Sequence, residues 1–328
     1  MITPPKQMPM GAIDLQRIPS RDLHSLEQVE AIENAVRHGK MATGQAVWIA
    51  IELVTHGSPQ ARDFLQILRN QSNHPDVLRY VERLEKHAEF IRAIPGIAEI
   101  QGNLALRAEL YKLGGFFFSR GDRQPEKLIV VFTTMYNNFY LSNLVFYAFL
   151  KQFGLSILIL KDCSFFNYLK GVTGLGNDIE QVTDNIALLA RRERISDIRI
   201  TGFSSGGYAS FYAACLLPCS RYLGFSLLST DFSKDSQLYP GKFFTDEVRS
   251  HIPEKCLTNL RQLFLARGHP IKGELYYGEN SNSDIEHAKN LAGLPDLTFT
   301  SIPNCAHQSV AALMERGELS DCFRRLLA

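Results

Sequence analysis

The spacing of hydrophobic residues changes near residue 95. Before that point apolar residues recur at helical intervals, and short polar turns separate the runs. A capping box of Ser25 and Gln28 begins the first predicted helix, which ends at Gly39. Three further helices are predicted, over 41–54, after Ser58-Pro59 and after His74-Pro75. Residues 21–95 are therefore predicted to form an all-helical cap or docking module, preceded by a loosely held arm over residues 1–20.

After Ile94-Pro95-Gly96 the pattern switches to short apolar runs that alternate with amphipathic segments. Residues 104–113 and 116–119 are interpreted as an opening hairpin. The later strands are predicted over 127–133, 155–160, 197–202, 222–228, 274–277 and 297–302. Helices are predicted over 139–153, 178–192, 208–217, 285–291 and 309–327. This alternation predicts an α/β domain over residues 96–328, with a doubly wound, mostly parallel sheet and an irregular insertion at 231–269.

The run that ends in Gly-Phe-Ser-Ser-Gly-Gly carries the first candidate chemistry. A β-branched strand leads directly into Ser204, and small residues open a helix behind it. A serine at so sharp a strand-to-helix turn tolerates only small neighbours two residues before and after it, and Gly202 and Gly206 occupy those positions. Ser204 is therefore a candidate nucleophile, with the backbone N–H of Ser205 directed at a developing oxyanion.

A serine hydroxyl needs a base within hydrogen-bond reach, and that base needs a group that orients it. His307 follows the last predicted strand and precedes the last predicted helix, where a loop could bring its imidazole over Ser204. Asp284 follows the strand at 274–277 and is the first candidate for the acid, although it could instead cap the next helix. Glu279 in the same loop and Asp231 after the strand at 222–228 remain alternatives.

Composition restricts the partners. The formal net charge is +1, and the 35 basic residues form no block, so neither nucleic acid nor an acidic membrane is implied. No stretch approaches the ~18 consecutive apolar residues of a membrane span, and the N-terminus lacks a signal-peptide core, so a soluble, cytoplasmic protein is expected. The six cysteines are scattered without a CxxC pair, which favours buried thiols over disulfides or zinc. The glycines at 171, 174 and 176 do not have dinucleotide-binding spacing, and no cofactor or metal is expected.

The order Ser204, Asp284, His307, with the serine in an elbow between strand and helix, resembles the α/β-hydrolase superfamily over about residues 100–328. The resemblance implies that Ser204 is acylated, that His307 acts as general acid and base, and that Asp284 orients the imidazole. It also implies a second oxyanion donor from the loop after the 127–133 strand. That loop has no glycine, so the donor must be the backbone N–H of Thr134, Met135 or Tyr136, and Met135 is the positional choice.

Aromatic residues follow two of the predicted strands at the edge where a pocket forms. Tyr136, Phe165 and Phe166 are the predicted substrate-binding residues, and Tyr239, Phe243 and Phe244 lie in the insertion. The leading hypothesis is a serine hydrolase for an ester, thioester or acyl group on a small molecule. An acyltransferase that uses the same triad and a non-catalytic scaffold remain alternatives. The helical module leaves open a homo-oligomer or a protein partner.

Overall fold

The computed structural model describes residues 43–112, 114–162, 166–230, 232, 236, 238 and 244–328. The chain divides into two compact units, residues 1–97 and residues 98–328. The predicted arm at 1–20 and the predicted helix that begins after Ser25 lie outside the described residues.

The described part of the first unit consists of three helices, α2 (Thr43–Thr55), α3 (Ala61–Gln71) and α4 (Pro75–Arg92). His74 caps α4, because its Nδ1 accepts a hydrogen bond from the Asp76 N–H at 3.3 Å, and Pro75 occupies the first helical position. Phe64 and Leu68 on α3 and Val81 on α4 are buried on the faces with which these helices pack together. The helical pattern before residue 95 is thus met by helices at 43–92.

The chain enters the second unit through α5 (Ile97–Gly102) and α6 (Leu104–Tyr111). The hairpin predicted from residue 104 is therefore wrong. Asn103 caps α6 by accepting a hydrogen bond from the Leu106 N–H at 3.0 Å, and the segment is rich in strong helix formers. β1 (Gly115–Ser119) instead pairs antiparallel with β3 (Leu155–Lys161), which is distant in sequence.

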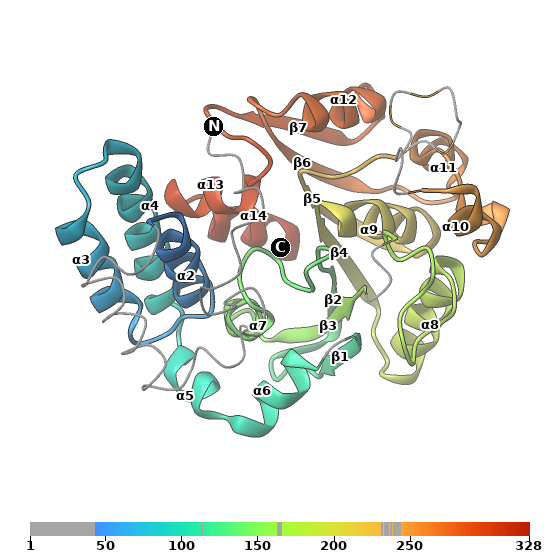
Figure 1. Ribbon diagram of the computed structural model, residues 1–328. Helices are drawn as coiled ribbons and strands as arrows, with labels where there is room; N and C mark the ends of the chain where they lie inside the picture. The colour runs from blue at the N-terminus through green and yellow to red at the C-terminus, as the bar shows by residue number, and fades with distance from the viewer. Residues whose placement is uncertain are drawn as a thin grey trace. The chain divides into compact units, whose positions relative to one another are not determined.

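The second unit is built on one sheet, whose seven strands among the described residues run in the order β1-β3-β2-β4-β5-β6-β7 (Figure 1). The strands besides β1 and β3 are β2 (Gln124–Phe132), β4 (Asp197–Phe203), β5 (Cys219–Phe225), β6 (Lys272–Gly278) and β7 (Leu297–Ile302). All neighbours other than β1 and β3 pair parallel. Every residue of β3 and the last five of β2 are buried, as expected for parallel strands covered on both faces. The prediction of a mostly parallel sheet is confirmed.

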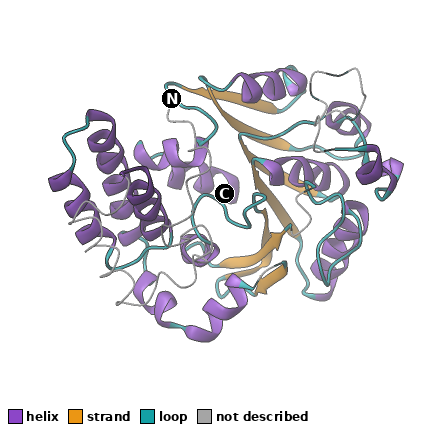
Figure 2. Cartoon of the chain, in the orientation of Figure 1, coloured by secondary structure: helices purple, strands orange, loops and turns teal. Residues whose placement is uncertain are grey.

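Helices cover both faces of this sheet, drawn in purple around the orange strands in Figure 2. One face carries α7 (Asn143–Lys151), α13 (Ser309–Glu315) and α14 (Leu319–Leu327). The other carries α8 (Ile179–Arg192), α9 (Ser205–Leu216), α10 (Asp246–Ser250), the 3₁₀ turn Glu254–Cys256, α11 (Leu260–Ala266) and α12 (Asn282–Leu291). The sheet is doubly wound, as predicted. Phe139 and Phe146 stack at 4.4 Å in the aromatic core of the first face.

Two further segments differ from expectation or lie partly outside the described residues. The predicted closing helix at 309–327 is two helices, because Gly317, with φ of +73°, ends the first of them. The insertion contains α10, the 3₁₀ turn and α11, while residues 231, 233–235, 237 and 239–243 lie outside the described part. Among the described residues, no helix combines the length and the apolar character that a membrane span requires.

The strand order places a topological switch point between β2 and β4. From β2 the chain moves to β3 on one side, and it then returns to add β4 on the other side of β2. In such sheets the loops at the carboxyl ends of the two strands separate at this point and open a crevice. The loop after β2 and the turn after β4 therefore leave the sheet from the same edge of neighbouring strands, and both carry predicted site residues.

Candidate active site

Ser204 stands alone between the end of β4 at Phe203 and the start of α9 at Ser205. Its backbone has φ of +54° and ψ of −118°, a conformation that residues with a side chain seldom adopt. The Ser204 N–H donates to the Phe225 carbonyl oxygen at 3.0 Å, which ties the strained residue to the neighbouring strand. The turn therefore projects the Ser204 side chain from the carboxyl edge of the sheet.

The two glycines that flank Ser204 are required by close contacts. A Cβ atom on Gly202 would lie 2.0 Å from the Ser210 Oγ, and one on Gly206 would lie 2.4 Å from the carbonyl oxygens of Phe132 and Thr133. Both distances are far shorter than any real Cβ contact. The Gly-x-Ser-x-Gly motif needs glycine at both positions because α9 lies very close to β4 and to the end of β2.

His307 lies between Ser204 and Asp284 and makes a hydrogen bond to each. Its Nε2 is 2.7 Å from the Ser204 Oγ, and its Nδ1 is 2.7 Å from an Asp284 carboxylate oxygen. These residues are 103 and 23 positions away from it in the sequence. The Phe203 ring stacks on the imidazole with a centroid distance of 5.9 Å. The structure thus brings together the three residues that the sequence proposed as a set.

The Asp284 carboxylate is completely buried. It accepts hydrogen bonds from the Ser281 hydroxyl at 2.9 Å and from the Gly278 N–H at 3.3 Å, in addition to the bond with His307. Burial by itself would raise the pKa of Asp284. The bond and charge of His307, together with the hydroxyls of Ser226 and Ser281, outweigh burial and hold this pKa below its ordinary value. The carboxyl group is therefore ionised at neutral pH.

Asp284 does not cap its helix, which was the structural alternative for this residue. Ser281 is the N-cap of α12 and accepts the Asp284 N–H at 3.2 Å. Of the alternative acids, Glu279 is exposed and accepts the Asn304 N–H at 3.3 Å, and Asp231 lies outside the described residues. Among the described candidates, Asp284 is the carboxylate that the structure places on His307.

The two predicted oxyanion donors lie in the segments that follow the neighbouring strands β2 and β4. Ser205 is the first residue of α9, so its N–H has no partner within the helix. In the loop after β2, the Thr134 N–H donates to the Asn138 carbonyl oxygen at 2.8 Å, and the Tyr136 N–H donates to the Thr134 hydroxyl at 3.3 Å. Within the described part of the chain, the Met135 N–H has no such acceptor. Of the three candidate donors in this loop, it is the one left available.

The predicted substrate-binding residues have different environments. The Tyr136 side chain is 75% exposed and that of Met135 is 38% exposed. Phe166 packs partly buried against the core, with the Lys170 ammonium 4.7 Å from its ring centroid, and Phe165 lies outside the described residues. Phe244 is buried against Phe232, while Tyr239 and Phe243 also lie outside the described part. Of the predicted substrate-binding residues that the structure describes, Tyr136 is exposed and Phe166 is partly buried; the predicted oxyanion donor Met135 also has an exposed side chain.

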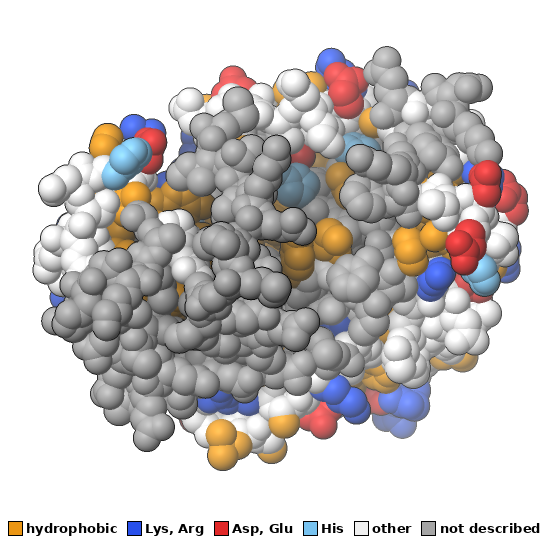
Figure 3. All heavy atoms as spheres, in the orientation of Figure 1, with side chains coloured by type: hydrophobic (Ala, Val, Ile, Leu, Met, Phe, Trp, Pro, Cys, Tyr) orange, Lys and Arg blue, Asp and Glu red, His pale blue; other side chains and the backbone are white. Residues whose placement is uncertain are grey.

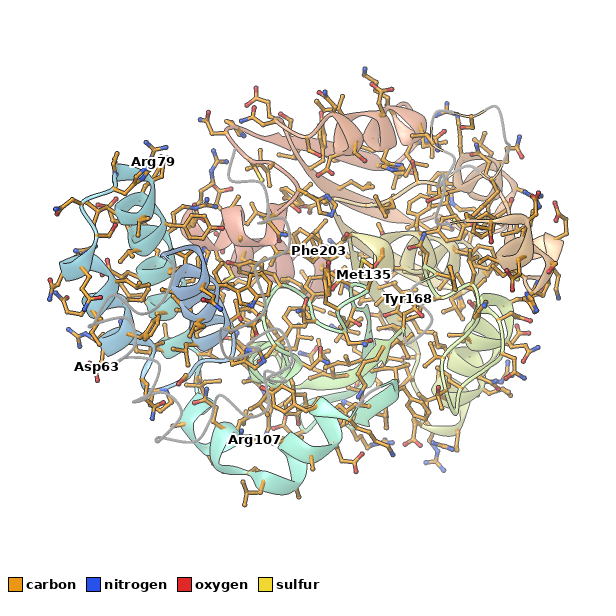
Figure 4. All side chains as sticks on the ribbon, viewed as in Figure 1. Asp63, Arg79, Arg107, Met135, Tyr168 and Phe203 are labelled. Atoms are coloured by element: carbon orange, nitrogen blue, oxygen red, sulfur yellow. The ribbon has the colours of Figure 1, made fainter. Side chains whose placement is uncertain are left out.

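The side chains labelled Met135 and Phe203 in Figure 4 come from the loop after β2 and from the last residue of the neighbouring strand β4. The space-filling view in Figure 3 shows hydrophobic and histidine side chains in the middle of this face, where Figure 1 places the ends of β4 and β5. Acidic and basic side chains gather toward the margins of the same view.

Residues that sequence reasoning missed surround the three proposed ones. Ser226 and Ser309 are both fully buried, with their hydroxyl oxygens 2.8 Å apart. His287 is buried one helical turn beyond Asp284, and its Nδ1 accepts the Ser229 N–H at 3.0 Å. The helical spacing of Asp284 and His287 was a usable signal. No feature of the sequence near Ser226 or Ser309 pointed to either serine.

The described residues provide no evident metal site, because they contain no group of three or more His, Cys, Asp or Glu side chains that could hold an ion. Five cysteines are free and buried, namely Cys215, Cys219, Cys256, Cys305 and Cys322, and Cys163 lies outside the described part. The glycines at 171–176 form a tight loop, in which the Val172 N–H donates to the Gly176 carbonyl oxygen at 2.9 Å. This loop is followed by α8 and not preceded directly by a strand.

No protein-family model and no curated protein matches the chain. Several solved structures are similar to it. One is a 2,6-dihydroxy-pseudo-oxynicotine hydrolase, with 13% identity and a TM-score of 0.49 over 90% of this chain and 86% of that one. Another is an α/β hydrolase enzyme, MGS-MChE2, from a lagoon-sediment metagenome, with 18% identity and a TM-score of 0.43 over 66% and 95%. MenH from S. aureus has 12% identity and a TM-score of 0.39 over 65% and 97%.

Proposed function

We propose that this protein is a serine hydrolase that acts on an ester, thioester or acyl group through an acyl-enzyme on Ser204. The observation that carries the proposal is the pair of 2.7 Å hydrogen bonds that connect Ser204, His307 and Asp284 in line. The positive φ of Ser204 supports it, because strained backbone persists where the surrounding structure enforces it and is concentrated at functional sites.

The chemistry follows from these contacts. As the Ser204 Oγ attacks a carbonyl carbon, the His307 Nε2 accepts the hydroxyl proton and the imidazole becomes a cation. The Asp284 carboxylate, which accepts the Nδ1–H, fixes the tautomer and stabilises that cation. The proton is then delivered to the leaving alcohol, thiol or amine. Attack of water on the acyl-enzyme, with His307 again as base, releases the acid and regenerates Ser204.

The oxyanion is proposed to bind the backbone N–H groups of Ser205 and Met135. The first is supported by its position at the start of α9, where the helix dipole also favours negative charge. The second is supported by the hydrogen bonds that occupy its neighbours Thr134 and Tyr136. Each such donor contributes on the order of 3 kcal/mol to the stabilisation of the transition state. The Thr134 and Asn138 side chains, bonded at 3.0 Å, hold this glycine-free loop in shape.

The proposal is tested by labelling with a fluorophosphonate, followed by mass spectrometry of the adduct. We expect an adduct on Ser204 in the wild type, none in Ser204→Ala and much slower labelling in His307→Ala. His251→Ala is the matched control, because His251 lies exposed after α10. The absence of labelling in folded wild-type protein would contradict the proposal and favour the scaffold alternative. Product analysis with alcohol acceptors then separates hydrolysis from acyl transfer.

A further inference from the structure

The turn that follows β5 lies between the nucleophile and the acid. β5 is the sheet neighbour of β4, which leads into Ser204, and of β6, which leads toward Asp284. Residues 225–229, named here the β5 turn, therefore leave the carboxyl edge of the sheet between these two side chains. No residue of this turn was among the candidates that the sequence offered.

The β5 turn holds the backbone of Ser204 from both sides. The Phe225 carbonyl oxygen accepts the Ser204 N–H at 3.0 Å, and the Leu228 N–H donates to the Ser204 carbonyl oxygen at 3.4 Å. Leu227 also packs against the first turn of α9, since a Cβ atom on Gly207 would lie 2.8 Å from the Leu227 Cα. The strained conformation of Ser204 is thus enforced partly by this neighbouring turn.

The same turn reaches the segment that carries the histidine. Ser226 is completely buried and has φ of +40°. Its Oγ lies 2.8 Å from the Ser309 Oγ, and the Ser309 N–H donates to the His307 carbonyl oxygen at 3.1 Å. Each hydroxyl has one proton, so one of the two serines donates to the other, and this contact ties the β5 turn to the segment that follows His307.

A third set of contacts fixes the helix on which Asp284 lies. The Ser229 N–H donates to the His287 Nδ1 at 3.0 Å, and the Ser229 hydroxyl donates to the His287 carbonyl oxygen at 2.8 Å. The Asn290 amide donates to the Ser229 carbonyl oxygen at 3.1 Å. Burial lowers the pKa of His287 to about 4, so its Nδ1 remains an acceptor at neutral pH. The second half of α12, the helix that carries Asp284, is therefore anchored to the β5 turn.

We propose that the β5 turn positions Ser204, the segment that carries His307 and the helix that carries Asp284, and that Ser226 is the positioning residue for His307. Ser226 touches no reacting atom. It acts through Ser309, whose hydroxyl it contacts and whose N–H donates to the His307 carbonyl oxygen, and so helps to hold the imidazole against the Asp284 carboxylate. The effect of Ser226 on catalysis rests on the proposed function. Its effect on the position of the His307 imidazole can be measured without a substrate.

The test compares Ser226→Ala and Ser309→Ala with Ser156→Ala. Ser156 is an equally buried serine whose hydroxyl donates to the Pro125 carbonyl oxygen at 3.1 Å, near the amino edge of the sheet. Three quantities are measured: the NMR signal of the His307 Nδ1–H, the fluorophosphonate rate resolved into reagent affinity and maximal labelling rate, and the free energy of unfolding. A merely structural serine would change only the last of these.

We expect Ser226→Ala to shift or broaden the Nδ1–H signal and to slow maximal labelling roughly tenfold, with reagent affinity unchanged. Ser309→Ala should change both in the same direction by less, and Ser156→Ala should change neither. A folded Ser226→Ala with the wild-type signal and labelling rate would overturn the inference while leaving the proposed function intact. If Ser226→Ala does not fold, the same two outcomes are read from Ser309→Ala. If the wild type does not label, the proposed function fails, and the NMR comparison alone decides the positioning role.

Discussion

The two ends of β4 differ in the polar contacts that they make. At its start, the Arg199 guanidinium is bonded to the Asp197 carboxylate, with Nε at 2.7 Å from one oxygen, and a third nitrogen donates to the Leu326 carbonyl oxygen. At the other end, Ser204 has a strained backbone, and its hydroxyl is hydrogen-bonded to the His307 imidazole at 2.7 Å.

The contacts at the start of this seven-residue strand contribute to stability, whereas those just after its end belong to the proposed chemistry. The pKa of Asp197 is lowered, and the largest cause of this shift is the hydrogen bond from Arg199. The pair has no proton that could move during a reaction. The carboxyl end has a hydroxyl, an imidazole and a carboxylate in line, so a proton can transfer from the first to the second. Substitutions at the two ends should therefore affect different measurements.

Asp284→Asn should produce the largest change. An amide in place of the carboxylate cannot stabilise the imidazolium and favours the wrong imidazole tautomer, so we expect the reaction rate at Ser204 to fall by about 10⁴-fold. The free energy of unfolding should change far less than the activation free energy. Fluorophosphonate labelling kinetics and urea unfolding of the same preparation measure both. A variant that labels within tenfold of the wild type would refute the role given to Asp284.

Arg199→Met should show the reverse behaviour. Removal of one partner leaves the Asp197 carboxylate without its main donor and costs about 3–5 kcal/mol of stability when such a pair is buried. Because Asp197 is about a quarter exposed, with its side chain 23% accessible, we expect the lower end of that range. Labelling per folded molecule should stay at the wild-type rate. A loss of labelling without a loss of stability would show that the two ends of β4 are coupled.

Acid should weaken the amino end of β4 in a defined direction. Asp197 has a folded-state pKa below its unfolded value of about 3.9, so its pairing stabilises the protein above that pH. This contribution disappears as the pH falls through the folded-state pKa. In urea unfolding between about pH 6 and 3, Asp197→Asn should therefore lose less stability on acidification than the wild type does. Equal slopes for the two proteins would contradict the assignment.

Glu279→Gln should have the smallest effect. This exposed carboxylate was an alternative acid, and its one described hydrogen-bond role is to accept the Asn304 N–H at 3.3 Å. An amide oxygen can accept the same bond, so labelling should stay within about twofold and stability within about 0.5 kcal/mol. The variant is the matched control for Asp284→Asn, since both replace a carboxylate in the β6–α12 region by its amide. A large loss of labelling would reopen the choice of acid.

Local sequence rules were sufficient where structure depends on neighbouring residues. The alternation of short apolar runs with amphipathic segments predicted the parallel sheet, because buried strands and their covering helices have different periods. They failed at 104–111, where helix-forming residues and the Asn103 cap outweighed an apparent strand pattern, and at Gly317, which divides the closing helix. In both segments the capping residues carried the information that hydrophobicity alone did not.

The sequence by itself determined the elbow around Ser204, the position of His307 after the last strand, and a short set of possible acids. Each of these depends on residues within a few positions of one another, so spacing and residue type encode them. Only the tertiary structure selected Asp284 among the described acids, identified the Met135 N–H as the available donor, and joined Ser226 to Ser309 across 83 residues. Such contacts arise from the order of strands in the sheet. No local pattern specifies which loops that order will bring together.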